Sequence, residues 1–211
     1  MAALKKFWVE NSLSIVMLGL FLIFLIGLSI AGLLHENEEL AQHGKAAISY
    51  WEFVTSGNFV EAVFENWESE FLQMWALVIL TVVLRQKGAV DSKKLEGSDP
   101  VDAAPSRKDL LGRLYSRSLG LALLALFLAS FALHAIGGTG AYNDEASQHG
   151  AELISVWQYI TSSQFWFESF QNWQSEFLAV GALLILSIFL REHGSPESKP
   201  VDAPNSETGS S

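Results

Sequence analysis

The sequence has no cysteine and little positive charge, and both absences exclude classes of protein. Without cysteine there is no disulfide framework, no cysteine-bound zinc or iron–sulfur cluster, and no thiol nucleophile. Lys and Arg number 13 against 23 Asp and Glu, a formal charge of −10. Because binding to phosphates depends mainly on Lys and Arg, we expect no nucleic acid partner. The chain also lacks a Gly-rich phosphate loop, a nucleophile elbow and a zinc-protease motif, so we predict no enzyme.

The sequence is rich in apolar residues, which make up 50% of it and gather in long runs. Residues 13–34 carry no charge and, as a helix, are long enough to cross a hydrocarbon core of about 30 Å. Residues 119–136 form a similar run, interrupted by Ser130 and by His134, which we expect to be a packed or interfacial residue. Residues 71–84 and 177–190 are shorter and need extra length to span.

The chain contains an internal repeat. Residues 12–88 align without a gap on residues 118–194, with 33 of 77 positions identical, which indicates a duplicated unit. We therefore predict an all-α integral membrane fold with four transmembrane helices, arranged as two tandem two-span repeats related by a pseudo-two-fold axis along the membrane normal. The predicted domains are a first repeat (1–88), a flexible cytoplasmic linker (89–110), a second repeat (111–194) and a disordered C-terminal tail (195–211).

One seven-residue motif heads the second apolar run of each repeat. It reads N-W-E-S-E-F-L from Asn66 and N-W-Q-S-E-F-L from Asn172. The short runs span only if this motif enters the membrane, which places Glu70 about 22 Å along the helix from Arg85. Glu176 lies at the same depth in the second repeat.

A carboxylate at that depth is costly, by about 2.5 kcal/mol or more at mid-membrane, so it needs a partner or a proton. Our candidate ligand-binding or ion-binding residues are the polar residues of the motif that share one helical face: Asn66, Ser69, Glu70, Asn172, Ser175 and Glu176. Asn66 is the expected partner of Glu70, and Asn172 of Glu176. The alternatives are that these side chains form hydrogen bonds between helices, or that the membrane boundary lies one turn deeper and the glutamates sit among the lipid headgroups. Glu61, Glu65 and Glu68 lie on the opposite face, which we expect to be solvated.

Histidine and glutamate recur at a spacing of four beyond the first apolar run, at His35, Glu39 and His43. This spacing places them on one face of a helix, where they could hold a metal ion. The second repeat keeps Glu145 and His149. We interpret both segments as exposed polar turns, so we predict no metal and no cofactor, with His43 and His149 as the alternative metal candidates.

The basic residues predict the orientation of the chain. Twelve of the 13 lie near the N-terminus, in the central connection or near the C-terminus, and by the positive-inside rule these parts are cytoplasmic. The opposite side carries Lys45 alone against 13 acidic residues. Residues 48–53 and 154–159 mix aromatic and polar side chains, which is typical of short amphipathic helices at the outer interface.

The sequence resembles a family of uncharacterised bacterial membrane proteins, a domain of unknown function. The resemblance consists of an apolar span, a Gln-His-Gly segment, an aromatic stretch and the motif at Asn66 leading into a second span. It implies a bacterial inner-membrane protein and no particular activity. We expect a non-enzymatic membrane scaffold or interaction protein with an acidic, aromatic outer rim. Its partners would be the lipid bilayer and a membrane protein or a second copy. The alternative is a small cation or proton channel or transporter that uses Glu70 and Glu176.

Overall fold

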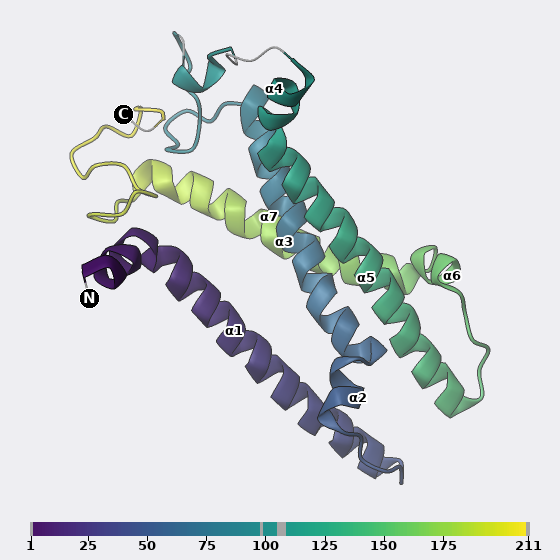
Figure 1. Ribbon diagram of the computed structural model, residues 1–211. Coiled ribbons are helices and arrows are strands. Elements are labelled where there is room, and N and C mark those ends of the chain that lie inside the picture. The colour runs from purple at the N-terminus through teal and green to yellow at the C-terminus, as the bar shows by residue number, and fades with distance from the viewer. Residues whose placement is uncertain (1, 98, 105–108, 210–211) are drawn as a thin grey trace. The chain divides into compact units, whose positions relative to one another are not determined.

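The computed structural model describes residues 2–97, 99–104 and 109–209, and these residues form helices and turns without a strand (Figure 1). The all-α prediction is confirmed. Of the predicted linker and tail, residues 98, 105–108 and 210–211 lie outside the described residues. The elements in chain order are α1 (Ala2–Gln42), α2 (Tyr50–Val54), α3 (Gly57–Val83), η1 (Pro100–Asp102), α4 (Leu110–Tyr115), α5 (Ser118–His149), α6 (Val156–Ile160) and α7 (Ser163–Phe189).

Three helices of the described chain are long and apolar enough to cross a membrane, so a membrane protein is indicated. They lie at Lys5–Gln42, Ser118–His149 and Ser163–Phe189. The expected fourth span, in α3, is not supported. Although α3 has 27 residues, its middle carries Glu65, Glu68 and Glu70, which leave no sufficiently apolar stretch of span length.

The structure divides into two compact units, and their boundaries do not follow the sequence repeat. Unit 1 comprises Met1–Glu61 and Gly137–Leu153, and unit 2 comprises Ala62–Ile136 and Ile154–Ser211. Both α3 and α5 contribute residues to each unit. The predicted arrangement of two tandem two-span repeats is therefore not supported.

Polar and aromatic contacts join α1 to the segment around α2 in unit 1. The hydroxyls of Ser29 and Tyr50 lie 3.0 Å apart. The Asn37 side chain accepts from the Ile48 N–H at 2.7 Å and donates to the Ile48 carbonyl at 3.2 Å. The Phe53 ring packs so closely on Gly32 that a Cβ there would lie 2.6 Å from the ring. These contacts hold the short α2 helix against α1.

Backbone segments approach closely in unit 1 where glycine is present on both. A Cβ on Gly57 would lie 2.3 Å from the Ala141 nitrogen and 2.6 Å from the Gly140 carbonyl carbon. A Cβ on Gly137 would lie 2.5 Å from the Glu61 nitrogen. Since backbone atoms cannot move aside as the end of a side chain can, these positions require glycine.

We expect Gly57→Ala to lower the free energy of unfolding by about 1–3 kcal/mol, because overpacking forces the two backbones apart. The matched control is Gly27→Ala in α1, where a Cβ meets nothing within 4 Å. That change should be neutral or stabilise by about 0.5–1 kcal/mol, since alanine favours a helix more than glycine does. Thermal unfolding in detergent, followed by circular dichroism, measures both. Equal melting temperatures for the two variants would contradict the close approach.

Short helices α2 and α6 form where the sequence predicts them, and each begins with the same capping arrangement. The Ser49 hydroxyl accepts from the Glu52 N–H, while the Glu52 carboxylate accepts from the Ser49 N–H at 2.7 Å. The pKa of Glu52 is lowered mainly by the bond from the Ser49 N–H and further by the interaction of its carboxylate with the Ser49 hydroxyl. Ser155 and Gln158 repeat the arrangement at α6. Both capping boxes satisfy N–H groups at the helix start that would otherwise lack partners.

A serine hydroxyl caps the start of α3. The helix begins at Gly57, and the Ser56 hydroxyl accepts from the Phe59 N–H at 3.3 Å. Asn58 donates to the Glu36 carboxylate at 2.8 Å. Asn58 therefore ties α3 to α1 within unit 1.

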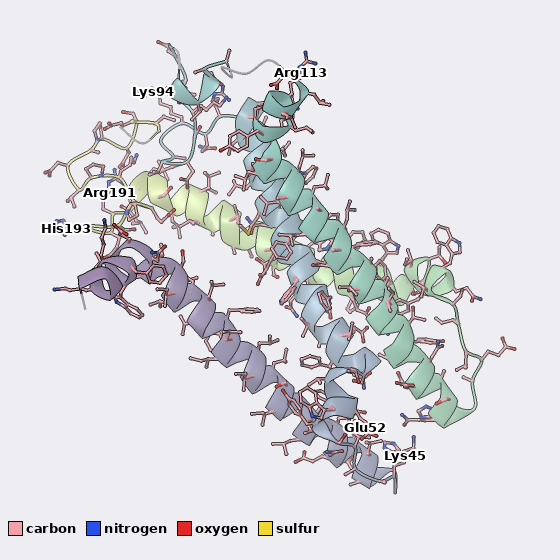
Figure 2. The ribbon with its side chains drawn as sticks, viewed as in Figure 1. Lys45, Glu52, Lys94, Arg113, Arg191 and His193 are labelled. Carbon is pink, nitrogen blue, oxygen red and sulfur yellow. The ribbon has the colours of Figure 1, made fainter. Side chains whose placement is uncertain are left out.

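Helix α7 crosses the α3 and α5 segments of unit 2, and its C-terminal end meets the tail of the chain (Figure 1). Figure 2 labels Arg191 at this end. Its guanidinium donates to the Ala203 carbonyl and to the Asn205 side chain, both at 2.9 Å. The Gly88 N–H donates to the Thr208 hydroxyl at 2.8 Å. The part of the predicted tail up to residue 209 is thus hydrogen-bonded to α7 and to the loop after α3.

Candidate functional site

A fully buried glutamate lies at the centre of unit 2. Glu68 of α3 has an exposed fraction of 0%, and both of its carboxylate oxygens are used. The Nδ1 atom of His134, on α5, lies 2.8 Å from Oε2, and the Trp173 Nε1–H of α7 donates to Oε1 at 2.8 Å. One carboxylate therefore joins three helices. The prediction that Glu68 lies on a solvated face is wrong.

The histidine in this arrangement has two unlike ring nitrogens. His134 is also 0% exposed, and Nδ1 is held by Glu68. Nε2 lies 3.6 Å from Oε2 of Glu168 on α7, just outside hydrogen-bond distance, and has no hydrogen-bond partner among the described residues. With Glu68 ionised, its carboxylate only accepts hydrogen bonds, and Nδ1 then carries the proton of this bond. Nε2 is then the nitrogen that can gain or lose a proton.

Glu168 is oriented by a tyrosine. The hydroxyl of Tyr159, a fully buried residue of α6, donates to Oε2 of Glu168 at 2.6 Å. This is the same oxygen that faces His134. Glu68, His134, Glu168 and Tyr159 thus form a continuous polar series, which we call the Glu–His–Glu cluster.

Aromatic rings enclose the cluster. The ring of Phe165, which is fully buried, stacks on His134 with centroids 4.8 Å apart and an interplanar angle of 27°. Phe165 in turn contacts Phe131, Tyr159 and Trp166 edge to face. These rings keep water from His134, so electrostatic interactions within the cluster are stronger than they would be at a surface.

A further acidic residue adjoins the cluster. The Asn172 side chain donates to the Glu65 carboxylate and, at 3.3 Å, to the backbone carbonyl of Glu168. Glu65, Glu68 and Glu168 therefore lie around one histidine, and His134 is the ion-pair partner that the structure gives to Glu68 and Glu168. With all three acids ionised, the group is negative even when His134 is protonated, so it would attract a proton or another cation.

The structure separates the predicted site into two places. Glu70 is exposed and Glu176 half-buried, and their charges are close enough to interact. The predicted amide partners are wrong, because Asn66 donates to the Ala62 carbonyl and Asn172 to Glu65. The hydroxyls bond within their own helices, with Ser69 buried and Ser175 exposed.

The alternative metal candidates lie at helix ends. In both His43 and His149, Nδ1 is within 3.0 Å of the backbone carbonyl one turn earlier, that of Glu39 or Glu145. Both histidines are exposed. This geometry stabilises a helix C-terminus and leaves Nδ1 unavailable to a metal.

Sequence reasoning missed the Glu–His–Glu cluster, although two signals were present. His134 interrupts an apolar run where the first repeat has Leu28, and Glu168 stands where it has Ala62. Both polar residues occur in the second repeat alone. The pairing of His134 with Glu68 was visible only in three dimensions, since the two residues are 66 positions apart.

Comparison with known proteins matches the chain to a family. A family model described as a domain of unknown function (DUF6766) matches residues 4–210. No curated protein and no solved structure matches the chain.

Proposed function

The chain belongs to the DUF6766 family, and we propose that it is a non-enzymatic integral membrane protein that moves protons through its Glu–His–Glu cluster. The observation that carries this proposal is His134, fully buried between the carboxylates of Glu68 and Glu168. Ionisable residues within a membrane-spanning segment are costly and so are candidates for function. Histidine is also the side chain whose ordinary pKa lies nearest to neutrality, which suits it to repeated proton transfer.

The two sides of the imidazole suggest the direction of the relay. Glu68 fixes the ring through Nδ1, while Nε2 faces the Glu168 oxygen that Tyr159 also contacts. A shift of less than 1 Å would bring Nε2 into hydrogen-bond distance of Glu168. Protonation of His134 at Nε2 followed by transfer to Glu168 would pass a proton from α5 to α7. The sequence suggested, as an alternative, a cation or proton pathway through Glu70 and Glu176. This proposal keeps a proton pathway but assigns it to the Glu–His–Glu cluster.

The proposed setting is a bacterial inner membrane, with both termini in the cytoplasm. Its support is the family resemblance and the basic residues near the termini and the central connection. Both termini lie on one side only if the chain crosses the membrane an even number of times, so this proposal includes a fourth crossing by α3 through its polar motif. Glu68 then lies about 25 Å along α3 from Arg85, in the outer part of the hydrocarbon core. The acidic outer side would concentrate cations near the cluster.

A second candidate function is an interaction scaffold that binds a membrane protein or another copy of this chain. The observation that favours it is a pair of exposed tryptophans at equivalent repeat positions, Trp51 in α2 (75% exposed) and Trp157 in α6 (73% exposed). Tryptophan suits both protein interfaces and the membrane interface.

Proton flux into liposomes tests the first proposal. The purified protein is reconstituted with a pH-sensitive dye inside, and a potassium gradient with valinomycin drives proton entry. We expect faster acidification than in protein-free liposomes, and a loss of about tenfold or more in His134→Gln, which can still hydrogen-bond to Glu68 but cannot carry a proton.

The matched control is His149→Gln, which changes an exposed histidine of the same helix and should leave the flux unchanged. Fluorescence and size-exclusion profiles check that His134→Gln is folded. If the parent protein acidifies liposomes no faster than lipid alone, or if His134→Gln equals the parent, the proton proposal is wrong and the scaffold becomes the better candidate.

A further inference from the structure

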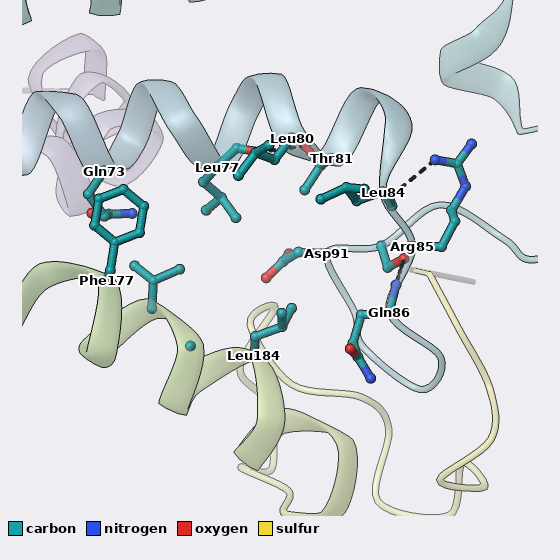
Figure 3. A pocket seen from close by; sticks show the side chains of 13 residues that line it. Gln73, Leu77, Leu80, Thr81, Leu84, Arg85, Gln86, Asp91, Phe177 and Leu184 are labelled. Atoms are coloured by element: carbon teal, nitrogen blue, oxygen red, sulfur yellow. Dashed lines mark hydrogen bonds between the residues drawn. The ribbon is translucent and has the colours of Figure 1, made fainter. Parts of the chain in front are cut away.

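Unit 2 contains a cavity of about 290 Å³ between α3, α7 and the loop that follows α3 (Figure 3). The volume lies near the lower limit of small-molecule sites, which run from about 300 to 1,000 Å³. The cavity lies along the cytoplasmic half of α3 on the orientation proposed above. None of the residues of the Glu–His–Glu cluster lines it.

The walls of the cavity are apolar along its length. They are formed mainly by Leu77, Leu80 and Leu84 of α3 and by Phe177, Val180 and Leu184 of α7. Gly181 lies in the wall from α7, and a Cβ there would meet nothing within 4 Å. The space next to Gly181 is therefore open, and the walls suit a hydrocarbon chain.

The exposed residue Asp91 lines one end of the cavity. Figure 3 shows the Asp91 side chain directed into the space between the two helices. The Asp91 carboxylate has no hydrogen bond or ion pair with the residues that the structure describes.

Two basic residues near that end are bonded elsewhere. Arg85 also lines the cavity, but its guanidinium points away from it in Figure 3 and donates to the carbonyls of Val82 and Leu84. The Lys93 ammonium is bonded to Asp102 and to the Val82 carbonyl. The charge that faces the cavity at this end is therefore negative.

The opposite end of the cavity is also close to negative charge. Gln73 and Phe177 line it, and Glu70 lies one helical turn before Gln73. Glu176, which immediately precedes Phe177, interacts with the charge of Glu70. Negative charge near both ends would repel an anion and attract a cation.

We propose that this cavity binds an amphiphilic organic cation, with its ammonium group at Asp91 and its apolar chain between α3 and α7. The shape and the apolar walls fit the chain, and the Asp91 carboxylate fits the head group. Both features are needed, because a solvent-accessible ion pair alone contributes only about 0–1 kcal/mol. The site does not depend on proton movement through the Glu–His–Glu cluster.

Isothermal titration of the full chain in lipid nanodiscs tests the proposal, with empty nanodiscs subtracted and no proton gradient. The probe is hexyltrimethylammonium. Hexanesulfonate has the same chain with the opposite charge, and tetramethylammonium has the head group without the chain. We expect saturable binding of hexyltrimethylammonium at one site per chain and no saturable binding of the other two.

Two variants locate the site. Asp91→Asn should weaken binding about fivefold, the effect of one accessible ion pair. Gly181→Leu should abolish binding by filling the cavity, and it is expected to fold because a Cβ there meets no other atom within 4 Å. The matched control Asp202→Asn changes an exposed aspartate of the tail and should bind as the parent does.

Equal binding of hexanesulfonate, or an unchanged affinity in Asp91→Asn and Gly181→Leu, would overturn the proposal. So would a phospholipid retained in the cavity that the cation fails to displace, as read by native mass spectrometry. Because no flux is measured, a protein that binds the cation but moves no protons would contradict the proposed function alone.

Discussion

Glu68→Ala should lower the free energy of unfolding by about 3–5 kcal/mol, the effect of breaking a buried ion pair by removing one partner. The change leaves the His134 Nδ1 and the Trp173 Nε1 without their shared acceptor. Neutral hydrogen bonds between membrane helices contribute only about 0.6 kcal/mol on average. Here, however, one fully buried carboxylate serves an ionisable ring and an indole together, so the larger figure applies.

Unfolding in mixed detergent micelles, followed by tryptophan fluorescence, measures this effect. The matched control is Glu70→Ala, which removes an exposed carboxylate two residues along the same helix. We expect that control to lie within about 0.5 kcal/mol of the parent. A loss of the same size in both variants would show that Glu68 contributes no more to the free energy of unfolding than an exposed glutamate does.

The double variant Glu68→Leu/His134→Leu should be more stable than Glu68→Ala, although it changes two buried residues. Replacing a buried ion pair by apolar residues of similar size is often neutral or stabilising. In this double variant Glu168 loses His134 as its ion-pair partner but keeps the hydrogen bond from the Tyr159 hydroxyl. Leucine is also the residue at the equivalent of position 134 in the first repeat, Leu28. The remaining cost, about 1–3 kcal/mol, comes from the Trp173 N–H that loses its acceptor.

The same double variant separates structure from function. It should fold yet show no proton flux above lipid alone, because neither side chain can carry a proton. A cycle with the single variants Glu68→Leu and His134→Leu should give a coupling energy of about 1–3 kcal/mol. If the two single losses simply add, Glu68 and His134 do not act as a pair; if the double variant still conducts protons, the relay lies elsewhere.

The positions of the helices could largely be predicted from local sequence patterns. The apolar run 13–34 lies within α1, and the aromatic segments near 48–53 and 154–159 coincide with α2 and α6. These elements depend on the length and spacing of apolar residues and on capping residues a few positions away. Such signals do not require knowledge of what each helix packs against.

The burial of individual acids could not be predicted in the same way. The helical wheel correctly separates Glu68 from Glu70 on α3, but it does not say which face is covered. The repeat suggested the wrong face. The second repeat has glutamate, Glu176, at the position equivalent to Glu70, but glutamine, Gln174, at the position equivalent to Glu68. Three-dimensional contacts reverse that choice, with Glu68 buried against His134 and Glu70 exposed.

The amino-acid sequence by itself determined that this chain is helical, apolar enough for a membrane and strongly acidic, because those properties depend on composition and on short-range periodicity. The tertiary structure decided which carboxylates matter. A buried acid is tolerated only beside a partner, and the partners of Glu68 come from α5 and α7, more than 60 residues away.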